Sequence, residues 1–349
     1  MSVFIEVEHI TTYRYANPVA FSPHKLMFRP RAAHDLRVLQ AGLEVSPLAR
    51  QHWIHDVFSN SVAVVEPVGP ATELRLAARF VIEHFGVHNL ELPVAPEAQD
   101  YPFEYSADDK LDLAPFLPLQ YPEDAAAVSA WVQPFLPARG VIHTQDVLRN
   151  IAEGIRADFR YASRDAMGTQ RPAQTLALGS GTCRDFALLM MEAARGLGLA
   201  ARFVSGYLYD KALDDGCGAS APAPSADPAA GGLQQGARQP ESADAGAVTR
   251  GAGSTHAWLH VYLPGAGWVP FDPTNTLYGG TDLIRVAYTR TPEQAAPVAG
   301  AWFGAADDYL GMTVEVAVRQ LTPEAAAAIL AADLQLPLPA DADPACEAV

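Results

Sequence analysis

Alternating apolar and polar positions dominate the first 86 residues of the chain. Between Val3 and Tyr15 the pattern repeats every two residues, which is typical of a strand with one buried face. The apolar side carries Val3, Ile5, Val7, Thr11, Tyr13 and Tyr15, and the polar side carries Glu6, Glu8 and Arg14. Similar runs follow at residues 36–45, 56–67 and 73–85, with a turn near Ser59 and Asn60. Strands at this spacing predict a small antiparallel sandwich or barrel.

The periodicity becomes helical after two proline-rich stretches at residues 92–105 and 114–124. Val147, Leu148, Ile151 and Ile155 recur at helical spacing behind Thr144, the expected N-cap. A second apolar helix and several strands follow. We therefore expect a β-rich N-terminal domain over residues 1–110 and an α+β domain over residues 111–320. The Ala-rich and Pro-rich residues 321–349 predict a short helix and a loose tail.

Residues 211–254 interrupt the second domain with a stretch rich in Gly, Ala, Pro and Ser. Such a composition buries too little apolar surface to order itself. Strand-like runs lie on both sides, so we interpret this stretch as a long exposed insertion within one domain.

Length and charge narrow the range of partners. A chain of 349 residues suffices for two domains with a substantial core, and its net charge of −16 repels phosphate backbones and anionic membranes. We therefore expect neither nucleic acid nor membrane as a partner. The chain has no long apolar run, and its N-terminus lacks the basic and apolar regions of a signal peptide. These features predict a cytoplasmic protein.

Three cysteines, Cys183, Cys217 and Cys346, are too few and too scattered for a disulfide framework, and none forms a CxxC pair. Cys183 is distinctive because it begins the apolar stretch CRDFALLMMEAARGLG. One helical face there carries Phe186, Leu189, Met190, Ala193, Ala194 and Leu197. Thr182 and Asp185 form a loose capping box, which places Cys183 in the first turn. Unpaired N–H groups and the helix dipole favour a thiolate there, and the glycines at 179 and 181 allow a ligand to approach.

A nucleophilic cysteine needs a base, and the base needs a group that orients it. The stretch THAWLHVYLPGAGWVPFDPTN predicts a hairpin that contains His256, His260 and Asp272. His256 and His260 are four residues apart on a strand, roughly 13 Å, which is too far to bind one metal ion. We therefore expect neither a metal nor a cofactor, and His256 and Asp272 are the candidate base and orienter.

The hairpin register decides whether those two residues meet. A turn centred on Gly265 and Ala266 would point Asp272 away from His256. A turn centred on Pro264 places Asp272 directly across from His256. We predict the second register, or a bulge that gives the same facing.

These residues resemble the transglutaminase-like superfamily, specifically the bacterial transglutaminase-like proteins with their own N-terminal domain. GTCRDFALLMMEAARGLGLAARFVSGYL, preceded by FRYASRDAMGTQRPAQTLALGS, and then THAWLHVYLPGAGWVPFDPTN are similar to the family's Cys, His and Asp blocks. The opening IEVEHITTYRYANPVAFSPHKLMFRPR resembles its N-terminal β domain. The similarity covers residues 1 to about 315, and the insertion at 211–254 is longer than the family pattern suggests.

The resemblance implies a papain-like core, in which a helix bearing the cysteine packs on an antiparallel sheet bearing the histidine and the aspartate. It assigns Cys183 as nucleophile, His256 as base and Asp272 as orienter. Candidate substrate or oxyanion contacts, suggested by their place in the sequence, are Trp258, Gly181, Tyr161 and Gln170.

These assignments predict a thiol enzyme that attacks a peptide or glutamine-type amide carbonyl of a peptide or protein and forms a thioester acyl-enzyme. Hydrolysis is the favoured outcome because the sequence marks neither an amine site nor a calcium loop. One alternative is an acyltransferase or a protein cross-linking transglutaminase. Another is a non-catalytic binding module. The natural substrate and the oligomeric state stay open.

Overall fold

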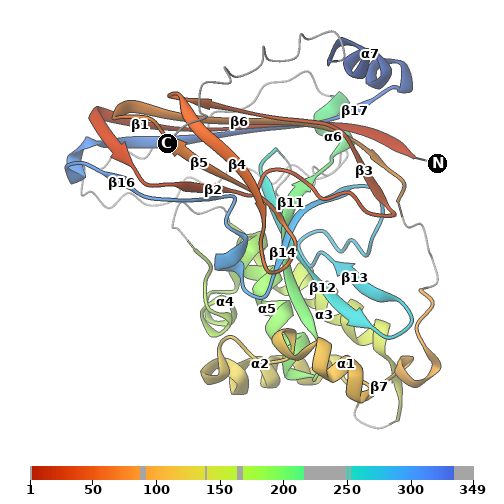
Figure 1. Cartoon of the computed structure of the whole chain (residues 1–349). Coiled ribbons are helices and arrows are strands. Elements are labelled where there is room, and N and C mark those ends of the chain that lie inside the picture. The colour runs from red at the N-terminus through yellow and green to blue at the C-terminus, as the bar shows by residue number, and fades with distance from the viewer. Residues whose placement is uncertain are drawn as a thin grey trace, which may run out of the picture.

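The computed structural model describes residues 2–86, 92–137, 140–162, 168–215, 250 and 253–333. Figure 1 shows two bodies, a β body at the top and a mixed body below it in which helices pack on a second sheet. The predicted α+β class with an all-β N-terminal region is confirmed. Among the described residues, no helix combines the length and apolar character needed to cross a membrane.

The β body is a sandwich of two antiparallel sheets. Its strands are β1 (Val3–Phe21), β2 (His24–Leu26), β3 (Leu36–Ser46), β4 (Ala49–His55), β5 (Ser61–Pro67), β6 (Ala71–His84), β15 (Val298–Ala299), β16 (Trp302–Phe303) and β17 (Tyr309–Leu321). One sheet has the order β16-β1-β6-β3, with β17 paired to β1, and the other has the order β15-β2-β5-β4. Leu26 and Val65 from one sheet pack with Leu74 and Leu76 from the other. The predicted sandwich is therefore confirmed.

The C-terminal strands correct the predicted division of the chain. Residues 298–321, which the sequence pattern assigned to the second domain, pair with β1 and β2 of the β body. Figure 1 shows blue β17 lying along red β1. The boundary near residue 110 is also misplaced, because Val94 and Ala98 already pack in the core of the second body. Local periodicity predicts a strand but carries no information on which sheet it joins.

The second body is built from helices on a four-stranded sheet. Its sheet has the order β13-β12-β11-β14, formed by β11 (Ala201–Leu208), β12 (Thr255–Leu263), β13 (Gly267–Phe271) and β14 (Leu283–Thr289). The α-helices of the chain are α1 (Ala107–Asp112), α2 (Ala125–Val132), α3 (Thr144–Asp158), α4 (Pro172–Leu178), α5 (Cys183–Gly196), α6 (Lys211–Asp215) and α7 (Pro323–Asp333). Two-residue strands lie at β7 (Asp100–Tyr101), β8 (Ile142–His143), β9 (Arg160–Tyr161) and β10 (Ser180–Gly181). Single 3₁₀ turns lie at Pro96–Ala98, Ala114–Phe116, Pro122–Asp124, Gln133–Phe135, Pro292–Ala295 and Ala306–Asp308.

Helix α5 is the central element of this body. The sequence predicts a helix with one apolar face, but nearly every residue from Cys183 to Arg195 is buried, Arg184 being half-buried. The helix packs against β11 and β12 as well as against α2, α3 and α4. A helix surrounded on all sides cannot rotate or slide without disturbing several neighbours, and this fixes the position of its first residue.

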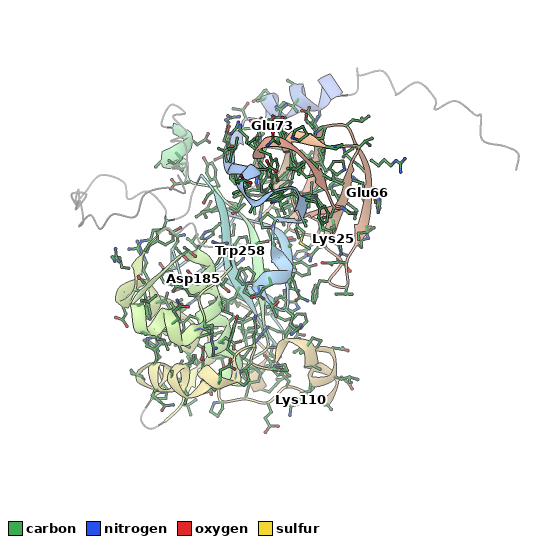
Figure 2. The ribbon with its side chains drawn as sticks, turned by 90° about the vertical axis from the view of Figure 1, so that its left-hand side faces the viewer. Lys25, Glu66, Glu73, Lys110, Asp185 and Trp258 are labelled. Atoms are coloured by element: carbon green, nitrogen blue, oxygen red, sulfur yellow. The ribbon has the colours of Figure 1, made fainter. Side chains whose placement is uncertain are left out.

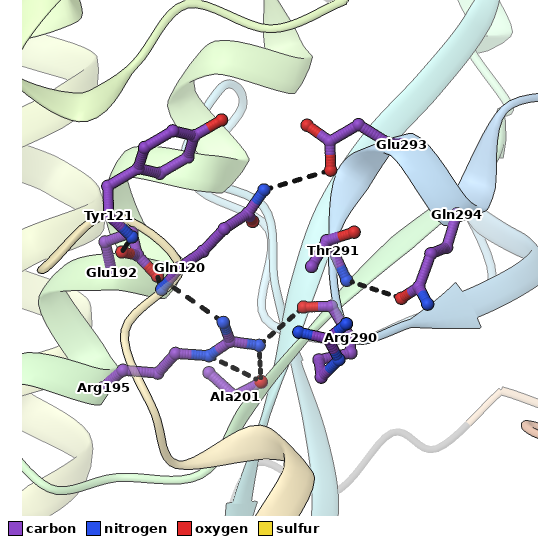
Figure 3. A network of polar contacts seen from close by, with 9 residues as sticks. All are labelled: Gln120, Tyr121, Glu192, Arg195, Ala201, Arg290, Thr291, Glu293 and Gln294. Atoms are coloured by element: carbon purple, nitrogen blue, oxygen red, sulfur yellow. Dashed lines mark hydrogen bonds and ion pairs between the residues drawn. The ribbon is translucent and has the colours of Figure 1, made fainter.

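A buried ion pair anchors the other end of α5. Arg195 Nη1 lies 3.5 Å from Glu192 Oε1, and the Arg195 guanidinium donates to the carbonyl oxygens of Ala201 and Arg290. Glu192 in turn accepts from the backbone N–H groups of Gln120 and Tyr121. Figure 3 shows how this network ties the helix to the segment before α2 and to the chain after β14.

The start of α3 differs in one detail from the expectation. Thr144 is the first residue of α3 and not its N-cap, and its hydroxyl donates to the Ala98 carbonyl at 2.8 Å.

Residues 216–249 of the expected insertion lie outside the described residues, as does the tail from residue 334. The described start of the insertion forms α6, where Asp214 accepts from the Tyr209 hydroxyl and from the Gln320 backbone. The predicted helix after Leu321 is confirmed as α7.

Candidate active site

Cys183 is the first residue of α5, as the sequence predicts. The Asp185 carboxylate holds the turn before it, because Oδ2 accepts from the Thr182 backbone N–H at 2.8 Å and from the Thr182 hydroxyl at 2.9 Å. The other oxygen, Oδ1, accepts from the Gln170 backbone N–H at 2.7 Å. Asp185 is fully buried and completes the capping box of α5. The hydrogen bond with Gln170 holds the segment before α4 against the first turn of α5, a contact that the sequence did not predict.

The register of the β12–β13 hairpin is neither of the two that the sequence suggested. Leu259 pairs with Phe271 and Leu263 pairs with Gly267, so the turn is centred on Gly265 alone. The register centred on Pro264 is therefore wrong. One step beyond the last pair, Asp272 falls opposite Trp258, two residues from His256 and on the same face of the sheet. The predicted facing is correct, although Asp272 reaches His256 diagonally.

His256 and Asp272 form a buried hydrogen-bonded pair. Nε2 of His256 lies 2.8 Å from Oδ2 of Asp272, and both side chains are fully buried. An ionised carboxylate can only accept, so Nε2 carries the hydrogen and Nδ1 is left as the basic atom. Within the described part of the chain, Nδ1 makes no hydrogen bond that meets ordinary geometric limits.

The protonation of His256 links it to Cys183. Burial lowers the pKa of His256, but the charge and hydrogen bond of Asp272 and the nearby Cys183 side chain together raise this pKa to about 10. Burial raises the pKa of Asp272, yet His256, Asn275 and Thr274 hold it below its usual value. The arrangement therefore favours an imidazolium between a carboxylate and a sulfur atom.

Two residues just after Asp272 orient its carboxylate, and the sequence analysis missed both. The Thr274 backbone N–H donates to Oδ1 at 2.9 Å, and Asn275 Nδ2 donates to Oδ2 at 3.0 Å. The first of these is an Asx turn, in which an aspartate accepts from the backbone two residues later. The sequence Asp-Pro-Thr-Asn could have suggested such a turn.

Trp258 lies behind the histidine. Its ring stacks on the His256 ring with centroids 6.0 Å apart, and it is buried among Val204, Leu208 and Leu283. Figure 2 places Trp258 on the central sheet, between the β body above and the helices below. These contacts support the His256 ring, while a role of Trp258 in the substrate pocket stays a prediction.

The other candidate contacts lie on the segment that precedes Cys183. Tyr161 pairs with Gly181 in a short parallel ladder, two residues from Cys183. Burial, followed by the charge at Cys183, raises the pKa of Tyr161 above its usual value. Gly181 is needed for packing, since a Cβ there would lie 2.9 Å from Cβ of Asp185. Gln170 accepts from the Thr175 hydroxyl at 3.2 Å through Oε1. Their roles toward a substrate stay predictions.

His260, the other histidine of the hairpin, does not join this group, because its Nδ1 accepts from Arg202 at 3.1 Å. Cys217 and Cys346 lie outside the described residues. In the described part of the chain, His, Cys, Asp and Glu side chains nowhere form a group of three suited to a metal ion.

Two models of known families match parts of this chain. Residues 5–83 match the bacterial transglutaminase-like N-terminal region, and residues 136–273 match the transglutaminase-like superfamily. The chain belongs to the transglutaminase-like superfamily. The second match ends at Pro273, so it spans all of Cys183, His256 and Asp272.

Similarity to known proteins extends over most of the chain. An uncharacterised protein of Mycobacterium tuberculosis (strain H37Rv) is 27% identical over 308 residues, which cover 84% of this chain and 86% of that protein. An uncharacterised protein of Mycobacterium leprae is 23% identical over 316 residues, which cover 89% of this chain and 98% of that protein. The crystal structure of a candidate cysteine protease of Cytophaga hutchinsonii matches with a TM-score of 0.59 and 16% identity over 91% of each chain. At this identity the structural likeness establishes the fold alone.

Proposed function

We propose that the protein is a thiol enzyme that hydrolyses an amide bond of a peptide or protein through Cys183. One observation carries the proposal: the buried His256 ring is bound by the Asp272 carboxylate at one nitrogen and lies close enough to Cys183 for the sulfur to raise its pKa. A structural cysteine at the start of a buried helix needs neither a histidine nor a carboxylate beside it. The position of Cys183 in the first turn of α5 adds the partial positive charge of a helix N-terminus.

Acylation is the first half of the reaction. The Cys183 proton passes to His256 Nδ1, and Sγ attacks the carbonyl carbon of the amide. The C–N bond then breaks, and His256 returns the proton to the leaving amine. The acyl group stays on Cys183 as a thioester, and Asp272 keeps its charge throughout while it stabilises the imidazolium.

Deacylation is the second half. His256 Nδ1 takes a proton from water, the resulting hydroxide adds to the thioester carbon, and the C–S bond breaks. The proton returns to the sulfur, and a carboxylic acid leaves. The sum is one amide and one water converted to one amine and one acid. We expect the backbone N–H of Cys183, together with Tyr161 or Gln170, to stabilise the oxyanion of each step, because Cys183 begins α5 and the other two residues precede it in the chain.

The test measures the pH dependence of Cys183 alkylation by iodoacetamide, with Cys217 and Cys346 replaced by Ser. We expect rapid alkylation at pH 6, where a free thiol is almost wholly protonated, and loss of that rapid reaction in His256→Ala. Slow alkylation at pH 6 that His256→Ala leaves unchanged would indicate a structural thiol and favour the binding module.

A second measurement separates hydrolysis from acyl transfer. The Cys183 acyl-enzyme is formed with a p-nitrophenyl ester, and its breakdown is followed with and without a primary amine such as cadaverine. We expect the free acid as the main product in both cases. An amide product that dominates at millimolar amine would favour the transferase alternative.

A further inference from the structure

We propose that Asn275 is a positioning residue of the active site, which aims the Asp272 carboxylate at His256 and is itself held by the backbone of Arg250. This inference rests on the proposed function of Cys183, His256 and Asp272. It adds a residue to that site and links the site to the chain position where the described structure resumes after residues 216–249.

The Asn275 side chain uses its full hydrogen-bonding capacity. Its Oδ1 accepts from the Arg250 backbone N–H at 2.9 Å, and its Nδ2 donates to the Arg250 carbonyl at 3.1 Å. The same Nδ2 donates to Asp272 Oδ2 at 3.0 Å. Both hydrogens of the amide and its oxygen are thus used.

Arg250 determines which way the amide points. Because the Arg250 N–H is a donor, it must face the Asn275 oxygen, and the NH₂ group is then directed at the Arg250 carbonyl and at Asp272. A flipped amide would face the Arg250 N–H with a second donor and Asp272 with a second acceptor. The backbone of Arg250 therefore enforces the orientation in which Asn275 can serve the carboxylate.

Asn275 and His256 act on the same oxygen. Nε2 of His256 and Nδ2 of Asn275 both bind Oδ2, while the Thr274 backbone binds Oδ1. Three donors around one buried carboxylate fix its rotation and keep it ionised. With Asn275 absent, the carboxylate is held by one backbone donor besides the histidine, and its plane can turn away from Nε2.

The β body contains a matched control. Asn60 Nδ2 donates to Asp56 Oδ2 at 2.9 Å and to the Tyr288 carbonyl at 3.0 Å, and Asn60 Oδ1 accepts from the Tyr288 N–H at 3.1 Å. Asn60 thus makes the same bonds to one carboxylate and one backbone residue as Asn275. It contacts none of Cys183, His256 and Asp272, so its loss reports the cost of such a clamp to folding alone.

The experiment compares Asn275→Ala, Asn275→Asp and Asn60→Ala in the protein with Cys217 and Cys346 replaced by Ser. Each variant is assayed for thermal unfolding, for the pH profile of Cys183 alkylation, and for the downfield imidazole N–H resonance of His256. We expect Asn275→Ala to slow alkylation at pH 6 by roughly tenfold or more, as for loss of a hydrogen bond to a charged group, and to weaken the imidazole resonance. Asn275→Asp keeps the acceptor for Arg250 but sets a negative charge beside Asp272, and we expect an equal or larger effect.

The expected control result is a lower unfolding temperature in Asn60→Ala with the pH profile of the parent protein. If Asn275→Ala does not fold, Asn275→Asp supplies the pH profile, and a further variant, Asn275→Gln, supplies the imidazole resonance of its folded fraction. The inference would be overturned if the parent protein reacts rapidly and the Asn275 variants show the same pH profile as Asn60→Ala. Slow alkylation in the parent protein itself would overturn the proposed function instead.

Discussion

Asp272 Oδ2 lies 2.8 Å from His256 Nε2, although the hairpin register places Trp258 and not His256 across from Asp272. The two side chains meet diagonally, over two positions of the same sheet face. Asp272 directly follows the last residue of β13, and its backbone pairs with Leu277 to close a small loop. The carboxylate thus projects from the start of a tight turn whose own backbone and side chains hold it.

The charge of Asp272 is the feature that this geometry makes testable. Asp272→Asn keeps the shape but removes the charge that raises the pKa of His256, so we expect Cys183 alkylation at pH 6 to fall by roughly a hundredfold or more. Asp56→Asn is the control, because Asp56 also accepts from an asparagine and from backbone N–H groups but lies in the β body. Equal alkylation rates in the two variants would show that the carboxylate does not act on His256.

A substitution at Gly206 tests how closely the sheet is packed beside His256. It pairs with His256, and a Cβ at this position would overlap the Ile284 carbonyl oxygen and lie 2.9 Å from Cη2 of Trp258. We expect Gly206→Ala to lower the free energy of unfolding by about 1–3 kcal/mol and to slow Cys183 alkylation. Gly42→Ala in β3, where a Cβ meets no atom within 4 Å, should change stability by less than about 1 kcal/mol. Urea unfolding of the pair measures the difference, and equal stabilities would contradict the packing argument.

The ion pair at the far end of α5 predicts a large stability effect. Arg195→Met removes the partner of the buried Glu192 and leaves the carbonyls of Ala201 and Arg290 without their donor. We expect the free energy of unfolding to drop by about 3–5 kcal/mol. Lys110→Met breaks an exposed pair with Glu104 and should cost at most about 1 kcal/mol. Similar losses in both variants, measured by urea unfolding, would mean that Glu192 finds another partner.

His9 predicts how stability depends on pH. It is buried between the Tyr207 hydroxyl at 2.8 Å and the Thr11 hydroxyl at 3.0 Å, and burial lowers its pKa from 6.5 to about 4. Between those values the unfolded chain binds a proton that the folded chain does not. The contribution of neutral, buried His9 to the free energy of unfolding is therefore complete above pH 6.5 and is lost as the pH falls toward 4. The shift of the His9 pKa corresponds to about 3 kcal/mol of that free energy.

The measurement for His9 is urea unfolding from pH 7 to pH 4.5 in the parent protein and in His9→Gln. His24 and His260, whose pKa values burial also lowers, titrate in the same direction and are common to both proteins. We expect a smaller loss of stability on acidification in His9→Gln. Parallel pH curves would show that His9 is not buried in its neutral form.

Much of the candidate site could be predicted from the sequence because its signals are local. An apolar helical stretch with a capping aspartate places Cys183 in a first turn, and a two-residue period places His256 and Asp272 on one sheet face. The Asx turn that holds Asp272 is also a local feature, because it lies within the four consecutive residues Asp-Pro-Thr-Asn. Such features depend on neighbours in the chain and need no knowledge of the remaining fold.

The sequence by itself determined the first strands, the helices behind Thr144 and Cys183, the β12–β13 hairpin and the order of the candidate Cys, His and Asp residues. The tertiary structure decided which sheet residues 298–321 join, where the hairpin turn is centred and which backbone holds Asn275. It also decided that Glu192 and Arg195, two charged residues in the last turns of α5, are buried against each other. The physical reason is that a strand edge or a polar side chain can pair with many partners, and only the packing of distant segments selects one of them.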